Sequence, residues 1–364
     1  LSLAYRRIDA QGVVSGGPMW YLSQGLAARG WPRLGRLLAV VFCLLCIGGA
    51  LGAGNMFQIN QATQQFITVV APMTGGAASP FASPLVFGGA YALLVGLIIL
   101  GGIRSIARVT ARLVPLMAAL YLGAGLVIIG LHVGDLPDAL MQILVGAFTP
   151  QAGVGGLIGV MVQGLRRAAF SNEAGVGSAA IAHAAAKTNQ PVAEGLVALL
   201  EPFVDTVVIC TMTALVIILT GVSTQDADGI TLTSNAFASV IGWFPNLLTL
   251  AVILFAFSTS ITWYYYGEKS WLFLFGDNKL AKTGFKLLYL AALLVGASAT
   301  LTSVMNFADA MLLAMAFPNM IGLYILSGEV RRRLDAYFTG MRNGTIVPYV
   351  KKSPSSEAIQ REFS

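Results

Sequence analysis

Charged residues are scarce in this 364-residue chain, and the scarcity excludes most soluble folds. Asp, Glu, Lys and Arg make up 10% of the sequence, whereas hydrophobic residues make up 56%. An average soluble domain has about 25% charged residues, so this chain has too little polar surface to cover a globule of its size. No charged residue occurs between Arg36 and Arg104. Because a membrane-spanning helix needs roughly 20 apolar residues, this gap has room for two, and the sequence predicts a helical membrane protein.

Cysteine and histidine are also rare, with three and two copies. Cys43 and Cys46 form a CxxC pair inside an apolar run, where hydrocarbon disfavours the thiolate that a redox or zinc site needs. His132 and His183 have no neighbours at metal-ligand spacing. We therefore expect no cofactor. A membrane-embedded enzyme would have to rely on Glu201 and Asp205 alone, so we expect no enzymatic activity.

Apolar runs separated by charged or turn-rich segments predict an all-α bundle of about eight spans. If the first residue lies in the cytoplasm and the spans alternate, every Lys and Arg except Arg166 and Arg167 falls on the cytoplasmic side. The positive-inside rule thus supports the count, and it explains the net charge of +6 without nucleic-acid binding. The expected spans are residues 37–66, 85–101, 114–131, a broken segment at 156–185, 193–221, 247–266, 285–301 and 307–326.

This topology divides the chain into three parts. Residues 1–35 form a cytoplasmic segment, residues 36–328 the transmembrane bundle, and residues 329–364 a cytoplasmic tail. The polar, Ser- and Lys-rich end, 349–364, is typical of disorder. Because the first residues are polar and loop-like, we expect the chain to be an N-terminally truncated piece of a longer protein.

The strongest candidate for an interrupted helix is the stretch 164–178. It combines two arginines, a glutamate and several glycines at expected membrane depth, and Ser171 and Asn172 compete with helical hydrogen bonding. Unwound backbone in a membrane offers free N–H and C=O groups to a polar solute. We therefore expect the helix to be broken within this stretch. The alternative, an external loop before a short helix, would move Lys187 outside.

A second stretch that looks broken is 52–61. Gly54, Asn55, Gln58 and Gln61 share one helix face. Buried amides in lipid need partners, which can be another helix or a substrate. Contact with another helix explains Gln61, and both readings stay open for Asn55 and Gln58.

Hydroxyl groups gather in a third patch. Ser258, Thr259 and Thr262 lie on nearly one side of a helix, and Trp263 follows one turn after Thr259. Hydroxyl and carbonyl oxygens are hard, neutral ligands that suit an alkali cation. Hydrogen bonding of these hydroxyls to their own helix is the competing explanation.

Charges inside the expected spans need partners, because each costs about 2.5–3.5 kcal/mol on insertion scales. Glu201 and Asp205 lie one turn apart on one face, and Asp309 lies near the start of the last span. We therefore predict that Arg166 or Arg167 pairs with Asp309 or with Glu201 and Asp205, forming a gate or a scaffold.

Several of these segments resemble the alanine or glycine:cation symporter family, also called sodium:alanine symporters. The most specific match is FSNEAGVGSAAIAHAAAKT at 170–188, and the similarity runs across nearly the whole chain. The other matching segments follow in the family's order: GGPMWY at 16–21, GNM at 54–56, FTPQ at 148–151, LLEPFVDT at 199–206, AFST at 256–259 and YYGE at 265–268.

The resemblance implies the five-plus-five inverted-repeat fold of the leucine-transporter type (amino acid–polyamine–cation). About three further helices would precede GGPMWY, including another broken helix that supplies much of the substrate and sodium coordination. The resemblance also implies that Trp263 limits the size of the substrate side chain, and that Ser258 and Thr259 supply part of a sodium site. The unwound middle of the interrupted helix would be residues 170–175, facing the substrate. The implied substrate site consists of Gly54, Asn55, Gln58, Phe170, Ser171, Asn172, Glu173, Gly175, Thr259 and Trp263.

These observations together predict a secondary active symporter that imports small neutral amino acids such as alanine or glycine with sodium. We expect a multi-pass monomer in the bacterial inner membrane, with both ends of the chain in the cytoplasm. Alternatives are coupling to protons, a channel lined by the polar stripes, and a fragment without transport activity of its own.

Overall fold

The computed structural model describes residues 1–9, 12–148, 153–227 and 229–346. The expected disordered end, 349–364, and most of the FTPQ segment lie outside these residues. The chain divides into two compact units, Leu1–Tyr324 and Ile325–Ser364. In the second unit, the end of the last helix carries an ion pair between Arg333 and Glu329 at 2.8 Å.

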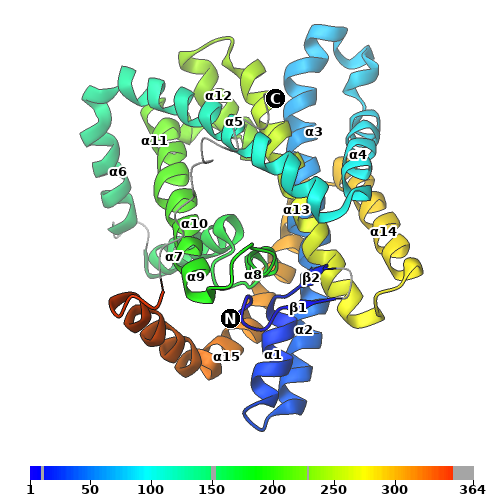
Figure 1. Ribbon diagram of the computed structural model, residues 1–364. Helices are drawn as coiled ribbons and strands as arrows, with labels where there is room; N and C mark the ends of the chain where they lie inside the picture. The colour runs from blue at the N-terminus through cyan, green and yellow to red at the C-terminus, as the bar shows by residue number, and fades with distance from the viewer. Residues whose placement is uncertain (10–11, 149–152, 228, 347–364) are drawn as a thin grey trace, which may run out of the picture. The chain divides into compact units, whose positions relative to one another are not determined.

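Within the described residues the regular secondary structure consists of helices and one short hairpin (Figure 1). The hairpin pairs β1 (Arg7–Ile8) with β2 (Val14–Ser15) in antiparallel fashion. The helices of the first half are α1 (Pro18–Ala27), α2 (Pro32–Leu51), the π-helical turn η1 (Gly52–Met56), α3 (Phe57–Val70), α4 (Pro84–Leu100), α5 (Gly102–Leu131) and α6 (Leu136–Phe148). Those of the second half are α7 (Gly153–Asn172), α8 (Ala179–His183), α9 (Pro191–Ala198), α10 (Leu200–Pro202), the π-helical η7 (Phe203–Cys210), α11 (Thr211–Leu219), α12 (Gly229–Val240), α13 (Phe244–Phe275), α14 (Lys279–Ser298) and α15 (Leu301–Arg342).

Six helical segments of the described residues are long and apolar enough to cross a membrane. The expected span 85–101 corresponds to α4, which is shorter, with 17 residues. The expected broken span corresponds to α7 and α8, which are separate helices. The prediction of a helical membrane protein is confirmed, whereas the count of eight spans and the inverted repeat stay predictions. The six segments are Pro32–Thr74, Ser105–Leu131, Pro191–Leu219, Phe244–Phe275, Lys279–Ser298 and Leu301–Arg342.

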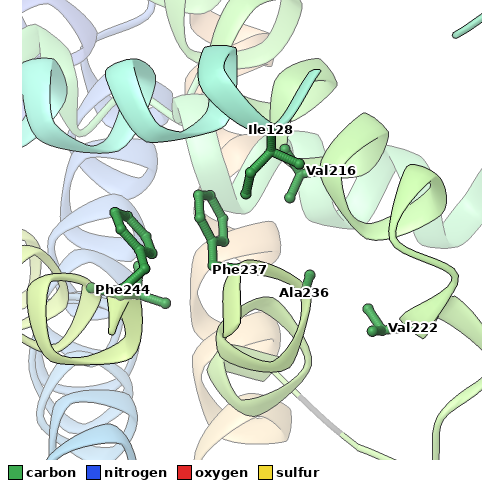
Figure 2. Packing of buried hydrophobic residues seen from close by; sticks show 7 residues of the cluster. Ile128, Val216, Val222, Ala236, Phe237 and Phe244 are labelled. Atoms are coloured by element: carbon green, nitrogen blue, oxygen red, sulfur yellow. The ribbon is translucent and has the colours of Figure 1, made fainter. Parts of the chain in front are cut away.

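The central element of the first unit is α13, which packs against α2, α3, α4, α5 and α14. Around its first turn lies a cluster of buried apolar side chains from α5, α11, α12 and α13 (Figure 2). Phe237 and Phe244 stack there with ring centroids 4.7 Å apart. Ile128 and Val216 complete the contact and have no exposed surface. This packing fixes α12 and α5 against the beginning of α13.

The stretch 52–61 is not broken, contrary to the sequence-based expectation. The chain stays helical from α2 through α3, and the glycines produce only the widened turn η1. A π-helical turn inserts one extra residue without freeing a run of backbone groups, and such turns are frequent at functional sites. At its centre Gly54 lies directly against Trp263, since an added Cβ would fall 2.1 Å from the tryptophan Cβ.

Glycine also allows α14 to approach this turn closely. A Cβ added at Gly296 would lie 2.5 Å from the Met56 Cα, which is backbone and cannot rotate away. Close backbone approach through small residues is the usual way in which membrane helices associate, because lipid provides no hydrophobic drive between them.

We predict that Gly296→Ala lowers the free energy of unfolding by about 1–3 kcal/mol, the usual cost of overpacking a filled interior. Gly284→Ala on the same helix is the control, since nothing lies within 4 Å of an added Cβ there. Thermal unfolding in detergent measures both. Equal melting temperatures for the two variants would contradict the close contact at η1.

Candidate functional site

The interrupted helix is present, but its break lies three residues later than expected. Phe170, Ser171 and Asn172 belong to α7, and the nonhelical backbone runs from Glu173 to Ser178. Glu173 has φ 57° and is the one non-glycine residue of the described chain with a positive φ. Gly175 at φ 79° and Gly177 at φ 104° follow in conformations that glycine adopts without steric cost. Left-handed backbone, rather than the polar side chains before it, therefore ends α7.

Polar side chains hold this break, and those of Asn172 and Asn319 hydrogen-bond to its backbone. The Ala174 N–H donates to the Asn172 Oδ1 at 2.8 Å, and the Ser178 hydroxyl donates to the Glu173 carboxyl. From α15, the Asn319 Nδ2 donates to the Gly175 carbonyl at 2.8 Å, and the Tyr21 hydroxyl donates to the Asn319 Oδ1. The Gly175 carbonyl thus has a protein partner already.

Asn319 and Tyr21 were not among the residues predicted from the sequence. Asn319 is 2% exposed and lies inside an otherwise apolar run, where an amide is expensive without a partner. That rarity is the signal that could have indicated a role for it.

The end of α7 meets η1, α3 and α13 in an aromatic junction. The rings of Phe57 and Phe170 pack edge to face with centroids 4.9 Å apart, and the Arg167 guanidinium lies 5.1 Å from the Phe170 centroid. Trp263 of α13 lies directly against Gly54. The contact between Phe57 and Phe170 therefore joins the first and second predicted stretches, and Trp263 packs on the second.

The amides of the second stretch have mostly structural partners. The Asn55 Nδ2 donates to the Tyr289 carbonyl on α14 at 2.7 Å, and the Gln58 Nε2 donates to the Ala53 carbonyl at 3.1 Å. The Gln61 Oε1 accepts from the Ile230 N–H at 3.0 Å, which confirms its helix-joining role. The Asn55 Oδ1 is buried without a protein partner. That oxygen is therefore the atom of this amide that remains able to accept from a ligand.

The hydroxyl patch on α13 bonds largely to its own helix. Ser258 donates to the Phe255 carbonyl at 3.0 Å, and Thr262 donates to the Ser258 carbonyl at 2.8 Å. The competing explanation of back-bonding therefore holds for both of these hydroxyls. Each hydroxyl oxygen keeps lone pairs that could coordinate a cation, so sodium binding by Ser258 and Thr259 stays a prediction.

Both arginines of α7 pair with Asp309 of α15. The Arg166 Nη2 lies 2.7 Å from the Asp309 Oδ2, and Arg167 contacts both oxygens of the same carboxylate. Asp309 is 4% exposed. Among the ion pairs of the described residues, neither arginine pairs with Glu201 or Asp205, so of the two predicted pairings the first is present.

The two other acids have different partners. The Ser171 hydroxyl donates to the Asp205 carboxylate at 2.5 Å, and the Asn172 Nδ2 donates to the Thr206 hydroxyl at 2.7 Å. These bonds tie the end of α7 to the π-helical η7. Glu201 lies 3.5 Å from the His183 Nε2.

His183, to which the sequence assigned no chemistry, lies between two carboxylates. Its Nδ1 is 2.7 Å from the Glu194 Oε1, and Glu201 lies on its other nitrogen. The contact joins the end of α8 to α9 and α10. No periodicity relates these three positions, so the sequence alone could not have indicated the cluster.

A cavity of about 1360 Å³ lies next to this cluster, and both His183 and Glu194 line it. Its walls come from the β1–β2 hairpin, the turn between α4 and α5, the end of α8 and the later part of α13. None of the predicted substrate or sodium residues lines it. Tyr266 does, and its ring centroid lies 5.3 Å from that of Trp263, so the cavity and the aromatic junction share a wall.

An interrupted helix whose break is held by polar side chains, within a bundle of apolar membrane-length helices, defines a polytopic membrane protein with a polar centre. The sequence matches the sodium:alanine symporter family over residues 1–352, and the chain belongs to that family. It is therefore a membrane transport protein and not an enzyme.

Several relatives are similar over most of the chain. A sodium/alanine symporter, AgcS of Methanococcus maripaludis, is 39% identical over 93% of this chain and 72% of its own length. An uncharacterized transporter of Haemophilus influenzae is 36% identical over 94% of this chain and 73% of its own. A probable sodium/glutamine symporter, GlnT of Bacillus subtilis, is 33% identical over 93% and 67%. The family and these relatives indicate sodium-coupled amino-acid symport.

We predict that Asp309→Ala lowers the free energy of unfolding by roughly 1–3 kcal/mol, between the values for exposed and for buried ion pairs, because both arginines are partly exposed. Arg166→Gln should cost less, since Arg167 still neutralises the carboxylate. The control is Asp138→Ala at an exposed position of α6. Thermal unfolding in detergent is the measurement, and equal melting of the Asp309 and Asp138 variants would contradict the prediction.

Proposed function

We propose that the protein is a sodium-coupled symporter that imports small neutral amino acids, alanine or glycine, across the bacterial inner membrane. The observation that carries the proposal is the break at residues 173–178, which is hydrogen-bonded to Asn319 of α15. Nonhelical backbone is tolerated at membrane depth where it is buried in protein or lines a polar cavity, and transporters bind solutes at such breaks.

In this proposal a zwitterion binds around Trp263. Glu173 offers a carboxylate for the substrate ammonium group, and the Asn55 Oδ1 offers a second buried acceptor. Peptide N–H groups of the break donate to the substrate carboxylate. Phe170 and the indole of Trp263 enclose a small side chain. Gly54 leaves the tryptophan little freedom to retreat, because the two residues are already in close contact.

Sodium binds in the proposal at the hydroxyl oxygens of Ser258 and Thr259. Neutral oxygen ligands give modest affinity, which suits an ion that must be released in every cycle. Proton coupling is the alternative, with a carboxylate of the site taking the place of the sodium site as the ion carrier.

The pair of arginines with Asp309 serves as a gate on the outer side. Arg167 contacts both Asp309 and the ring of Phe170, so it links the ion pair to the substrate site. Separation of α7 from α15 would break these contacts and uncover Phe170. The orientation follows the positive-inside rule, which places the first residue and the end of the chain in the cytoplasm.

The central prediction is that the complete gene product takes up labelled alanine only with an inward sodium gradient. Proteoliposomes with sodium, potassium or a pH gradient provide the measurement, and empty liposomes provide the control. Competition by unlabelled glycine and glutamine tests the substrate class, because GlnT is named for glutamine. If a pH gradient drives uptake in potassium buffer without sodium, protons and not sodium are the coupling ion. Currents that do not depend on any gradient would indicate a channel.

We also predict that Trp263→Ala admits bulkier amino acids. Removing the indole should improve kcat/KM for glutamine relative to alanine by roughly tenfold or more, since one or two methylenes in an apolar pocket are worth about 1–3 kcal/mol. Trp243→Ala is the matched control, because Trp243 is 65% exposed at the beginning of α13. Unchanged selectivity in the Trp263 variant would remove this residue from the substrate site.

A further inference from the structure

The N-terminal segment, residues 1–9 and 12–17, packs against α8 (Figure 1). Arg6 makes the polar part of the contact. Its guanidinium donates to the carbonyls of Ala186 at 2.9 Å, Thr188 at 3.1 Å and Ala184 at 3.4 Å, and to the Asn189 Oδ1 at 3.2 Å. One side chain thus holds the end of α8 and the loop that follows it.

The chemistry of this contact suits arginine specifically. The carbonyls that Arg6 binds belong to Ala184, the residue that caps α8, and to Ala186 and Thr188 in the loop after it. Because these carbonyls lie beyond the end of the helix, their donors come from elsewhere in the protein. A guanidinium has five N–H donors in a fixed planar fork, and a cation at a helix end also interacts favourably with the helix dipole. Lysine would keep the charge, but its single ammonium group has three donors at one point and could not bind all four acceptors.

Close apolar packing accompanies the polar contact. A Cβ added at Gly16 would lie 2.3 Å from the Ala184 Cβ, and one added at Gly17 would lie 2.7 Å from the Ile181 Cγ1. The Ser2 hydroxyl donates to the Ala180 carbonyl. The N-terminal segment therefore contacts α8 at Ala180 and Ile181 and also contacts the cap residue Ala184.

The same segment also contacts α13. The Lys269 Nζ donates to the Ser15 hydroxyl at 3.0 Å, and the Tyr265 hydroxyl donates to the Val14 carbonyl at 3.5 Å. Val13 and Val14 line the cavity together with the end of α8 and the later part of α13. The hairpin thus bridges two walls of the cavity.

We propose that Arg6 is a positioning residue for transport. It holds α8, the second piece of the interrupted helix, against the N-terminal hairpin and so keeps the cavity between α8 and α13 narrow. The cavity opens when the hydrogen bonds from Arg6 to the carbonyls of Ala184, Ala186 and Thr188 are released. The helix α8 then moves away from α13. The proposal rests on the proposed function, because it assigns this motion to the step in which the substrate leaves toward the side of Arg6.

The test measures the accessibility of a cysteine in the cavity. Ile106→Cys is the reporter, because Ile106 lines the cavity and is 3% exposed. It is introduced into the complete gene product in open membrane fragments, after replacement of every native cysteine by alanine. The labelling rate of this cysteine by a hydrophilic maleimide is then measured in two proteins, one with Arg6 and one with Arg6→Gln.

We expect Arg6→Gln to raise the labelling rate roughly tenfold or more, as loss of charge-assisted hydrogen bonds implies, and Arg6→Lys to give an intermediate rate. The matched control is Arg7→Gln. Arg7 is the neighbouring arginine, and its guanidinium lies 4.5 Å from the Trp20 ring instead of at α8. An equal rise in the Arg7 variant, or no rise in the Arg6 variant, overturns the proposal.

If Arg6→Gln does not insert into the membrane, Asn189→Ala and Ser2→Ala remove single contacts of the same interface. Each should raise the labelling rate by a smaller factor, and unchanged rates in both overturn the proposal. Labelling needs no substrate, so the outcome is separate from that of the uptake experiment. A raised rate in a protein that takes up no alanine would support the role of Arg6 and reject the proposed symport.

Discussion

The structure depends on one constraint, which is that nonhelical backbone inside a bilayer must find its hydrogen bonds within the protein. The break between α7 and α8 meets part of this constraint through two side chains. The Asn172 Oδ1 accepts from the Ala174 N–H, and the Asn319 Nδ2 of α15 donates to the Gly175 carbonyl. Within the break, the Val176 N–H donates to the Glu173 carbonyl. The contact of α15 with the break therefore follows from the need of this backbone for partners.

The two pieces of the interrupted helix are each held by arginine. Arg166 and Arg167 join α7 to Asp309, whereas Arg6 joins the end of α8 to the N-terminal segment. Apolar contact between membrane helices discriminates little between neighbouring positions, since lipid is as apolar as the side chains. Polar contacts are directional, and they can break and re-form with other partners. Because such contacts hold both α7 and α8, each of these helices can be fixed in one position and can still move relative to the bundle.

Two glycines allow α13 and α14 to pack closely against the π-helical turn η1. Gly54 lets Trp263 lie on η1, and Gly296 lets α14 touch the backbone of Met56. The same turn offers its carbonyl at Gly54 to the Tyr289 hydroxyl, and Asn55 bonds to the Tyr289 carbonyl. Asn55 and Gln61 of the polar stripe thus join this helix to α14 and α12, and the buried Asn55 Oδ1 has no protein partner.

The sequence by itself determined the class of the protein, the existence of a helix break and the family, because long apolar runs, glycines among polar residues and a specific motif are all local properties. It also limited the partners of Arg166 and Arg167 to three acids. Only the tertiary structure decided among those acids, moved the break to Glu173–Ser178, and joined His183 to Glu194 and Arg6 to the end of α8. These contacts connect residues on different helices, and no spacing along the chain encodes which groups meet when the helices pack.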